Sequence, residues 1–138
     1  MANPTRFTKV GMAGKPNFNG ANRGDYSLQT ITAPIAIVAA ATEQTTDVVL
    51  PAKCYVISTA LNVITPESTG ATKTIDIGLS TAGAAVLGDD VSVSTSAIVA
   101  GLGGQDGSGQ SVTYTLGSDD YAELDAEIVI QLLVADGK

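Results

Sequence analysis

The sequence predicts an all-β fold, namely an antiparallel β-sandwich that follows an extended N-terminal arm. Several segments alternate apolar and polar residues with the period of two that half-buried strands require. Turn-forming residues separate these segments roughly every eight to twelve positions, a spacing typical of sandwiches and barrels. The apolar residues are mainly Ala, Val, Ile and Leu, beside two Phe, four Tyr and no Trp, and β-branched side chains favour strands.

The segments between the turns give the expected strands. The most regular one lies within 72–80, where Ile75, Ile77 and Leu79 alternate with polar or small residues. The longest is 54–64, and its alternation predicts one face made of Tyr55, Ile57, Leu61 and Val63. The other expected strands are 31–41, interrupted early by Pro34, then 45–50, two short pieces at 85–87 and 91–93, and finally 97–100, 112–116 and 127–135.

Two connecting segments have a composition of their own. Residues 101–110 are rich in glycine without the spacing of a dinucleotide or phosphate loop, so a flexible loop tip explains them. Ser118, Asp119 and Asp120 are residues that cap helices, and one helical turn is therefore expected through Leu124. Helix content is otherwise expected to be close to nil.

A chain of 138 residues has the length of one domain with one core. We expect residues 1–27 to form the arm and residues 28–138 to form the sandwich. The sequence contains no apolar run of membrane-spanning length, and its start lacks the apolar core of a secretory signal. The single cysteine, Cys54, rules out an internal disulfide framework and is interpreted as a small buried thiol.

The arm holds the residues that we expect to bind a partner. Residues 1–24 contain four basic side chains and no acid, whereas residues 25–138 contain three basic and fourteen acidic side chains, a net charge of −11. The body should therefore repel nucleic acid, while the arm suits an acidic protein surface. Alternatively, the four charges only keep a tail solvated. The expected partner-binding residues are Arg6, Phe7, Lys9, Lys15, Phe18 and Arg23.

Catalytic chemistry has little support in the sequence. The chain has no histidine, which excludes Ser-His-Asp and Cys-His catalysis and most transition-metal sites. The pairs Asp89-Asp90 and Asp119-Asp120 are the remaining candidates, as glycosidase carboxylates or calcium ligands. The segment Asp106-Gly107-Ser108-Gly109 resembles a fragment of a calcium loop, but a solvated turn is the simpler interpretation. Arg23-Gly24-Asp25 matches an integrin-binding tripeptide that also arises by chance. The expectation is a protein that is not an enzyme and has no cofactor.

One part of the sequence resembles a known family. The run Val48-Val49-Leu50-Pro51-Ala52 leads into a long strand, and the turn Ser68-Thr69-Gly70-Ala71 leads into a strand that ends in Asp76-Ile77-Gly78-Leu79. This pattern, over about residues 50–134, resembles the head decoration, or cement, proteins of tailed bacteriophages. The resemblance supplies no catalytic residues.

The resemblance implies a jelly-roll-like sandwich that forms homotrimers on the outer surface of the virion. Such a protein would clamp neighbouring major capsid proteins, with the arm lying along the capsid or along a neighbouring subunit. An alternative is a fibre or adhesin module, which would bind a glycan or a host surface in a polar groove around residues 101–110 and Tyr114. No membrane partner is expected.

Overall fold

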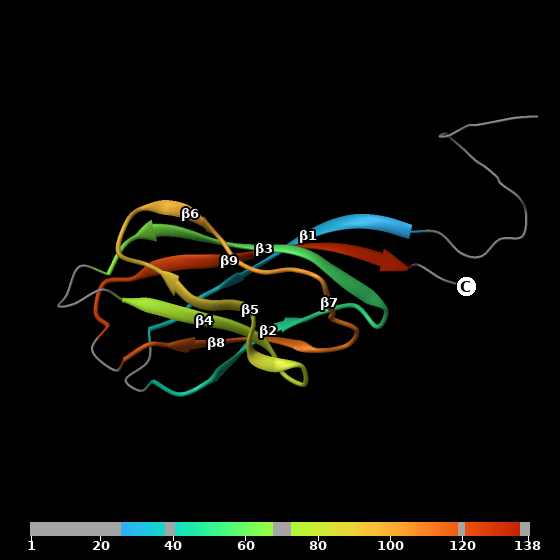
Figure 1. Cartoon of the computed structure of the whole chain (residues 1–138), viewed down its shortest axis with the longest axis horizontal. Coiled ribbons are helices and arrows are strands. Elements are labelled where there is room, and N and C mark those ends of the chain that lie inside the picture. The colour runs from blue at the N-terminus through green and yellow to red at the C-terminus, as the bar shows by residue number, and fades with distance from the viewer. Residues whose placement is uncertain (1–25, 38–40, 68–72, 119–120, 136–138) are drawn as a thin grey trace, which may run out of the picture. The chain divides into compact units, whose positions relative to one another are not determined.

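The computed structural model describes residues 26–37, 41–67, 73–118 and 121–135, and in these residues the protein is all β (Figure 1). The chain divides into two units, of which the larger is Leu28–Val134. No helix long and apolar enough to cross a membrane occurs in the described ranges. The strands are β1 Tyr26–Pro34, β2 Gln44–Val49, β3 Cys54–Thr65, β4 Thr74–Leu79, β5 Gly83–Ser92, β6 Ala97–Ala100, β7 Gln105–Asp106, β8 Ser111–Leu116 and β9 Asp125–Ala135.

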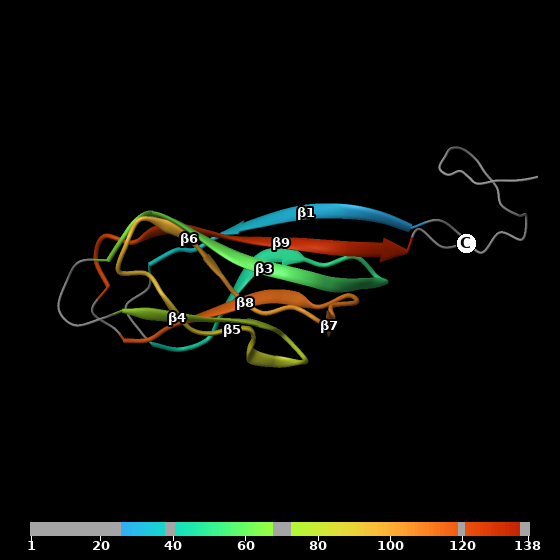
Figure 2. The same ribbon diagram turned by 45° about the horizontal axis from the view of Figure 1, so that its top comes forward.

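The strands form two sheets that pack face to face as a sandwich. One sheet has the order β1-β9-β3-β6, with β7 also paired with β3, and the other has the order β2-β8-β4-β5. Figure 2 shows the sheets as separate layers. The registers that connect β3 with β6, β7 and β9, and β8 with β2 and β4, are antiparallel. The predicted antiparallel β-sandwich is confirmed.

The pairing order is that of a long hairpin folded back on itself. β4 pairs with β5, and around this hairpin β3 pairs with β6, β2 with β8 and β1 with β9. Two sheets connected in this nested way are consistent with a jelly roll, which wraps eight strands as two Greek keys.

The core lies between the two inner faces. In β4 the side chains of Ile75, Ile77 and Leu79 have no solvent exposure, as the alternation of that segment predicted. In β9 every second residue from Ala126 to Val134 is buried. Each large aliphatic side chain in such positions contributes about 1.5–3 kcal/mol by leaving water. The core accordingly consists of aliphatic side chains from both sheets.

A β-bulge in β3 overturns the predicted faces of that strand. Val56 lies opposite Leu132, yet Ser58 lies opposite Gln131, so two steps along β3 match one step along β9. The extra residue reverses the alternation. Leu61 and Val63 are buried as expected, but Tyr55 and Ile57 are exposed and Val56 fills the core in their place. The sequence interpretation was wrong for Tyr55 and Ile57. In a strand with an inserted residue, the side chains before and after the insertion do not follow one alternation.

Two other strands differ from their predicted ranges. β1 begins five residues before the expected Ile31 and ends at Pro34, because proline has no N–H for the ladder. The two short pieces predicted at 85–87 and 91–93 are one strand, β5. Its pairing with β4 is irregular, since Ile75 lies opposite Val91 but Ile77 lies opposite Gly88. This bulge at Asp89 and Asp90 hid the continuity of the strand.

The expected helical turn at 118–124 is absent from its described residues, 118 and 121–124. A buried carboxylate organises this segment instead. Glu67 Oε1 accepts hydrogen bonds from the backbone N–H groups of Ala122, Glu123 and Leu124, at 2.8, 2.9 and 3.1 Å. Glu67 itself is 2 % exposed. One side chain thus satisfies three consecutive backbone donors that a helix would leave partly unpaired in its first turn.

The glycine-rich segment follows the edge of β3 rather than forming a flexible tip. The N–H groups of Gly101, Gly104 and Gly107 donate to the carbonyls of Thr59, Val56 and Cys54, at 2.7, 2.8 and 3.2 Å. In the same segment Leu102 N donates to the Leu87 carbonyl of β5 at 2.8 Å, which links the edges of the two sheets. Glycine is needed for this close approach, since a Cβ on Gly103 would lie 2.0 Å from the Ile57 carbonyl oxygen.

Candidate functional site

The predicted partner-binding residues of the arm lie outside the described residues. Arg6, Phe7, Lys9, Lys15, Phe18 and Arg23 all fall within 1–25, as does the tripeptide at 23–25. Their role therefore stays a prediction. The chemistry that the structure does describe lies on the body, where three features were candidates: the acidic pairs, the loop at 105–110 and the outer faces of the sheets.

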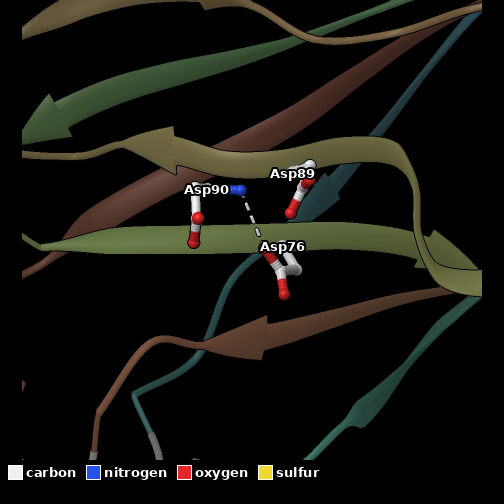
Figure 3. A group of neighbouring side chains, drawn as sticks. All are labelled: Asp76, Asp89 and Asp90. Atoms are coloured by element: carbon white, nitrogen blue, oxygen red, sulfur yellow. Dashed lines mark hydrogen bonds between the residues drawn. The ribbon is translucent and has the colours of Figure 1, made fainter.

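The pair Asp89-Asp90 meets Asp76 across the β4–β5 hairpin (Figure 3). One carboxylate oxygen from each of the three lies within 4.8 Å of the others. Asp90 N donates to Asp76 Oδ1 at 2.8 Å, and Thr74 Oγ1 donates to Asp90 Oδ1 at 3.3 Å. Asp90 has φ of 50°, a left-handed conformation that Asp tolerates better than most residues. These hydrogen bonds support the bulge of β5, which is a sufficient role for Asp76 and Asp90.

The second pair, Asp119-Asp120, lies outside the described residues. The nearest described acids are Glu123 and Asp125, and both are exposed. A glycosidase site requires two carboxylates on opposite sides of a sugar, so this hypothesis stays a prediction.

The segment with the resemblance to a calcium loop forms a tight hydrogen-bonded turn. Asp106 Oδ1 accepts hydrogen bonds from Ser108 Oγ at 2.7 Å and from Ser108 N at 3.0 Å. The hydrogen bonds from the Ser108 side chain and backbone lower the pKa of Asp106 below its ordinary value of 3.8. The same Ser108 hydroxyl accepts from Cys54 N at 3.1 Å, so the turn is fastened to the start of β3. The sequence interpretation of a turn is the one that this geometry supports.

Cys54 is a buried thiol, as expected. Burial raises the pKa of Cys54 above its ordinary value of 9.0, and the nearby charge of Asp106 raises it further. Both effects oppose thiolate formation, which is the opposite of what a nucleophilic or metal-binding cysteine needs. Cys54 is therefore interpreted as a packing residue of the core.

Tyr114, the aromatic residue expected in a polar groove for glycan binding, is not on the surface. Tyr114 is 4 % exposed and contributes to the core from β8. Its hydroxyl donates to the Ala36 carbonyl at 2.8 Å and accepts from Ala36 N at 3.1 Å. Tyr114 thus holds the connection that follows β1, and it offers no surface on which a sugar ring could stack.

The outer faces of the two sheets differ in chemistry. The outer side of β1-β9-β3-β6 is mostly uncharged, and we call its central part the apolar face. The outer side of β2-β8-β4-β5 holds acids from β2, β4 and β5 and no base, and we call this surface the acidic face. The apolar face comprises Tyr55, Ile57, Ala60, Ile98, Ala100, Val129 and Leu133, and the acidic face comprises Asp47, Asp76, Asp89 and Asp90.

The strand registers place these apolar residues on one side of the sheet, with the Ser58–Gln131 pair between them. Tyr55 lies directly opposite Leu133, and Ala60 has Val129 as its partner on one side and Ala100 on the other. Ile98, next to this pair on β6, is 75 % exposed. Because the bulge turned Tyr55 and Ile57 outward, sequence reasoning missed this surface. The only sequence signal for this surface was that apolar residues occupy both odd-numbered and even-numbered positions of 54–64.

The charged residues of the first sheet lie at the border of the apolar face. Asp125 and Glu127 open β9, and Asn62 Nδ2 donates to Glu127 Oε2 at 3.2 Å. β1, β3 and β6 contain no charged residue, whereas Asp106 of the short edge strand β7 lies directly opposite Tyr55. Recognition at this face therefore depends on apolar packing and shape, whereas the acidic face presents carboxylates to solvent or to a cationic partner.

Comparison with known proteins gives likeness in fold. No family model and no curated protein matches the sequence. Among solved structures, the chain is similar to a chain of the "Cyanophage Pam1 capsid asymmetric unit", with a TM-score of 0.60 and 13% identity over 93% of this chain and 98% of that chain. It is also similar to a chain of the "Acidic stable capsid structure of Helicobacter pylori bacteriophage KHP30", with a TM-score of 0.61 and 11% identity over 80% of this chain and 92% of that chain.

Proposed function

We propose that the chain is a structural protein of a bacteriophage virion, and that it serves as a decoration or cement protein on the outer surface of the head. In this role it binds the major capsid protein and stabilises contacts between neighbouring capsid subunits. The proposal assigns no catalytic activity and no cofactor to the chain.

The observation that carries the proposal is the shared fold with chains from two phage capsid structures. The similarity covers 98% of one neighbour chain and 92% of the other. It therefore concerns those chains as wholes and not a single domain inside a larger protein. Fold alone does not fix function, so the surface chemistry supplies the second line of support.

The body presents broad sheet faces that suit protein contact. Its described acids either line an exposed face or support turns, as Asp76 and Asp106 do. A cement protein acts by mass action, since a partner that binds only the assembled lattice stabilises that lattice. Several copies joined in one oligomer would bind more tightly than one copy, because later contacts form at high effective concentration.

Binding to heads tests the proposal. Heads of the virus that encodes the chain would be prepared without the protein, in expanded and unexpanded form, and mixed with the purified chain. We expect saturable co-sedimentation with expanded heads and a higher rupture temperature of the decorated heads. Absence of binding to either form at micromolar concentrations of chain would contradict the proposal.

The oligomer is part of the same proposal. A homotrimer has a mass of three times 13.9 kDa, or 41.7 kDa, and light scattering after size exclusion measures it directly. The alternative, a fibre or adhesin module, predicts binding to glycans or host cells without affinity for heads. The burial of Tyr114 leaves that alternative without the aromatic side chain that it assigned to the groove.

A further inference from the structure

We propose that the apolar face of the sheet β1-β9-β3-β6 binds a second copy of this chain, and that the acidic face remains exposed in the assembly. The inference rests on the self-association that the proposed function includes, but it does not depend on capsid binding. It assigns a surface to that contact, which neither the fold nor the similarity to other structures supplies.

The first step is the size of the exposed apolar surface. Ile98 is 75 % exposed, Tyr55 48 % and Ile57 42 %, and they share one side of the sheet with Leu133. With their smaller neighbours they expose on the order of 500 Å², much of the roughly 800 Å² that each partner contributes to a standard interface. The largest apolar patch on a typical monomer is itself about 300–600 Å² and often has a function, so apolar surface of this size is a candidate for an interaction site.

The second step is charge, which selects the partner. Residues 25–138 have a net charge of −11, and Asp47, Asp76 and Asp90 contribute to it on the acidic face. Two copies that met through their acidic faces would have to desolvate like charges against one another, which is costly. The apolar face has no such cost, because its charged residues lie at the border.

The third step is the kind of recognition that the apolar face offers. Within the described residues it presents no cation to attract an acidic lattice and no cluster of acids to attract a basic arm. Apolar, uncharged contact is characteristic of permanent interfaces between copies, which resemble a domain core cut in half. A second copy is therefore the occupant that the chemistry of this face favours.

The test places one charge on each face. Ile98→Glu puts a carboxylate at the most exposed position of the apolar face. Val49→Glu is the matched control, since Val49 lies on β2 of the other sheet and is 60 % exposed. Sedimentation velocity over a range of micromolar concentrations gives the mass of each species, and far-ultraviolet circular dichroism reports whether each variant is folded.

We expect the wild-type chain and Val49→Glu to form the same oligomer, and Ile98→Glu to dissociate to the 13.9 kDa monomer, with association weakened at least about tenfold. Tyr55→Ser is a milder second variant on the same face and should weaken association in the same direction. A monomeric wild type, or equal masses for Ile98→Glu and Val49→Glu, would overturn the inference.

Failure of this inference is distinguishable from failure of the decoration role. Wild-type chain that binds heads while remaining a monomer in solution contradicts the self-contact alone. Wild-type chain that self-associates through the apolar face, yet does not sediment with heads, contradicts the decoration role alone.

Discussion

Ser108 and Asp106 show how two short side chains fix the path of a glycine-rich segment. The hydroxyl of Ser108 donates to Asp106 Oδ1 and accepts from Cys54 N, so the turn and the start of β3 share one anchor. Gly107 lies between them, and a Cβ there would come within 2.7 Å of the Leu50 side chain. The sequence around the turn is therefore constrained by contacts to β3 and the core.

The Asp106 turn gives a pH-dependent prediction. The folded-state pKa of Asp106 is depressed below its ordinary value of 3.8, so its contribution to stability is present above that value and is lost as pH falls through the folded pKa. Urea unfolding of the wild type and Asp106→Asn should differ more at neutral pH than at pH values below the folded pKa. Ser108→Ala removes the main hydrogen-bond donor and should reduce this pH dependence; a difference that does not change with pH would contradict the assignment.

A second residue-scale prediction concerns Gly103. A Cβ at this position would lie 2.0 Å from the Ile57 carbonyl oxygen, so Gly103→Ala must push the segment away from β3. We expect a loss of about 1–3 kcal/mol in unfolding free energy, the usual effect of overpacking.

Gly104→Ala is the matched comparison for Gly103→Ala. Gly104 has φ of 81°, and its nearest neighbour to a new Cβ is at 3.6 Å, so the cost there is backbone strain of about 1–2 kcal/mol without a clash. If Gly103→Ala unfolds at the wild-type urea concentration, the close approach to β3 is not needed.

At the scale of elements, Glu67 joins two connecting segments that are distant in sequence. Its backbone N–H donates to the Val93 carbonyl at 3.0 Å after β5, while its carboxylate holds the segment that precedes β9. Lys73 is also buried. Its ammonium group donates a hydrogen bond to Ser118 Oγ at 3.2 Å and lies 5.2 Å from the centre of the Tyr121 ring. Cation–π contact at this distance is favourable. Polar side chains thus order the connections while the aliphatic core orders the strands.

Removal of the Glu67 carboxylate should destabilise the protein. Glu67→Ala leaves three backbone N–H groups without their acceptor, and we expect a loss of about 2–4 kcal/mol in unfolding free energy. Glu67→Gln keeps an acceptor oxygen of similar reach and should lose less. Urea midpoints of the two variants measure the difference, and an alanine variant as stable as the glutamine variant would show that the carboxylate is dispensable.

At the scale of the whole molecule, the charge of the chain is divided unevenly between the predicted arm and the rest of the sequence. Residues 1–24 have a charge of +4 and residues 25–138 a charge of −11. If the lattice is acidic, the body would be repelled by it, and the attraction would have to come from the arm. The arm and the apolar face would then have separate tasks, the arm binding the capsid and the face binding another copy.

Deletion of residues 1–24 tests this division. We expect the shortened chain to retain its folded body and its oligomer but to lose co-sedimentation with expanded heads. Reversing the charge of Arg6, Lys9, Lys15 and Arg23 to Glu in the full-length chain is a control for length, and it should weaken head binding similarly. Head binding retained by the deletion variant would remove the arm from the proposal.

The sequence was sufficient for the fold class and for the regular strands. Ile75, Ile77 and Leu79 are buried because a strand without irregularities obeys the period of two over its whole length. β6 occupies the predicted 97–100, because turn residues bound it on both sides. The buried thiol of Cys54 followed from its apolar neighbours. Each of these features depends on local pattern, which a sequence displays directly.

Tertiary structure alone decided the surfaces on which the proposed function depends. The bulge after Val56 turned Tyr55 and Ile57 outward, and the hydrogen bonds of Glu67 replaced a predicted helical turn. In both cases the deciding partner, β9 or the segment at 122–124, is more than fifty residues away in the chain, so local periodicity carries no information about it. Pairing across the sheets set which side chains meet, and therefore which face of the protein is apolar and which is acidic.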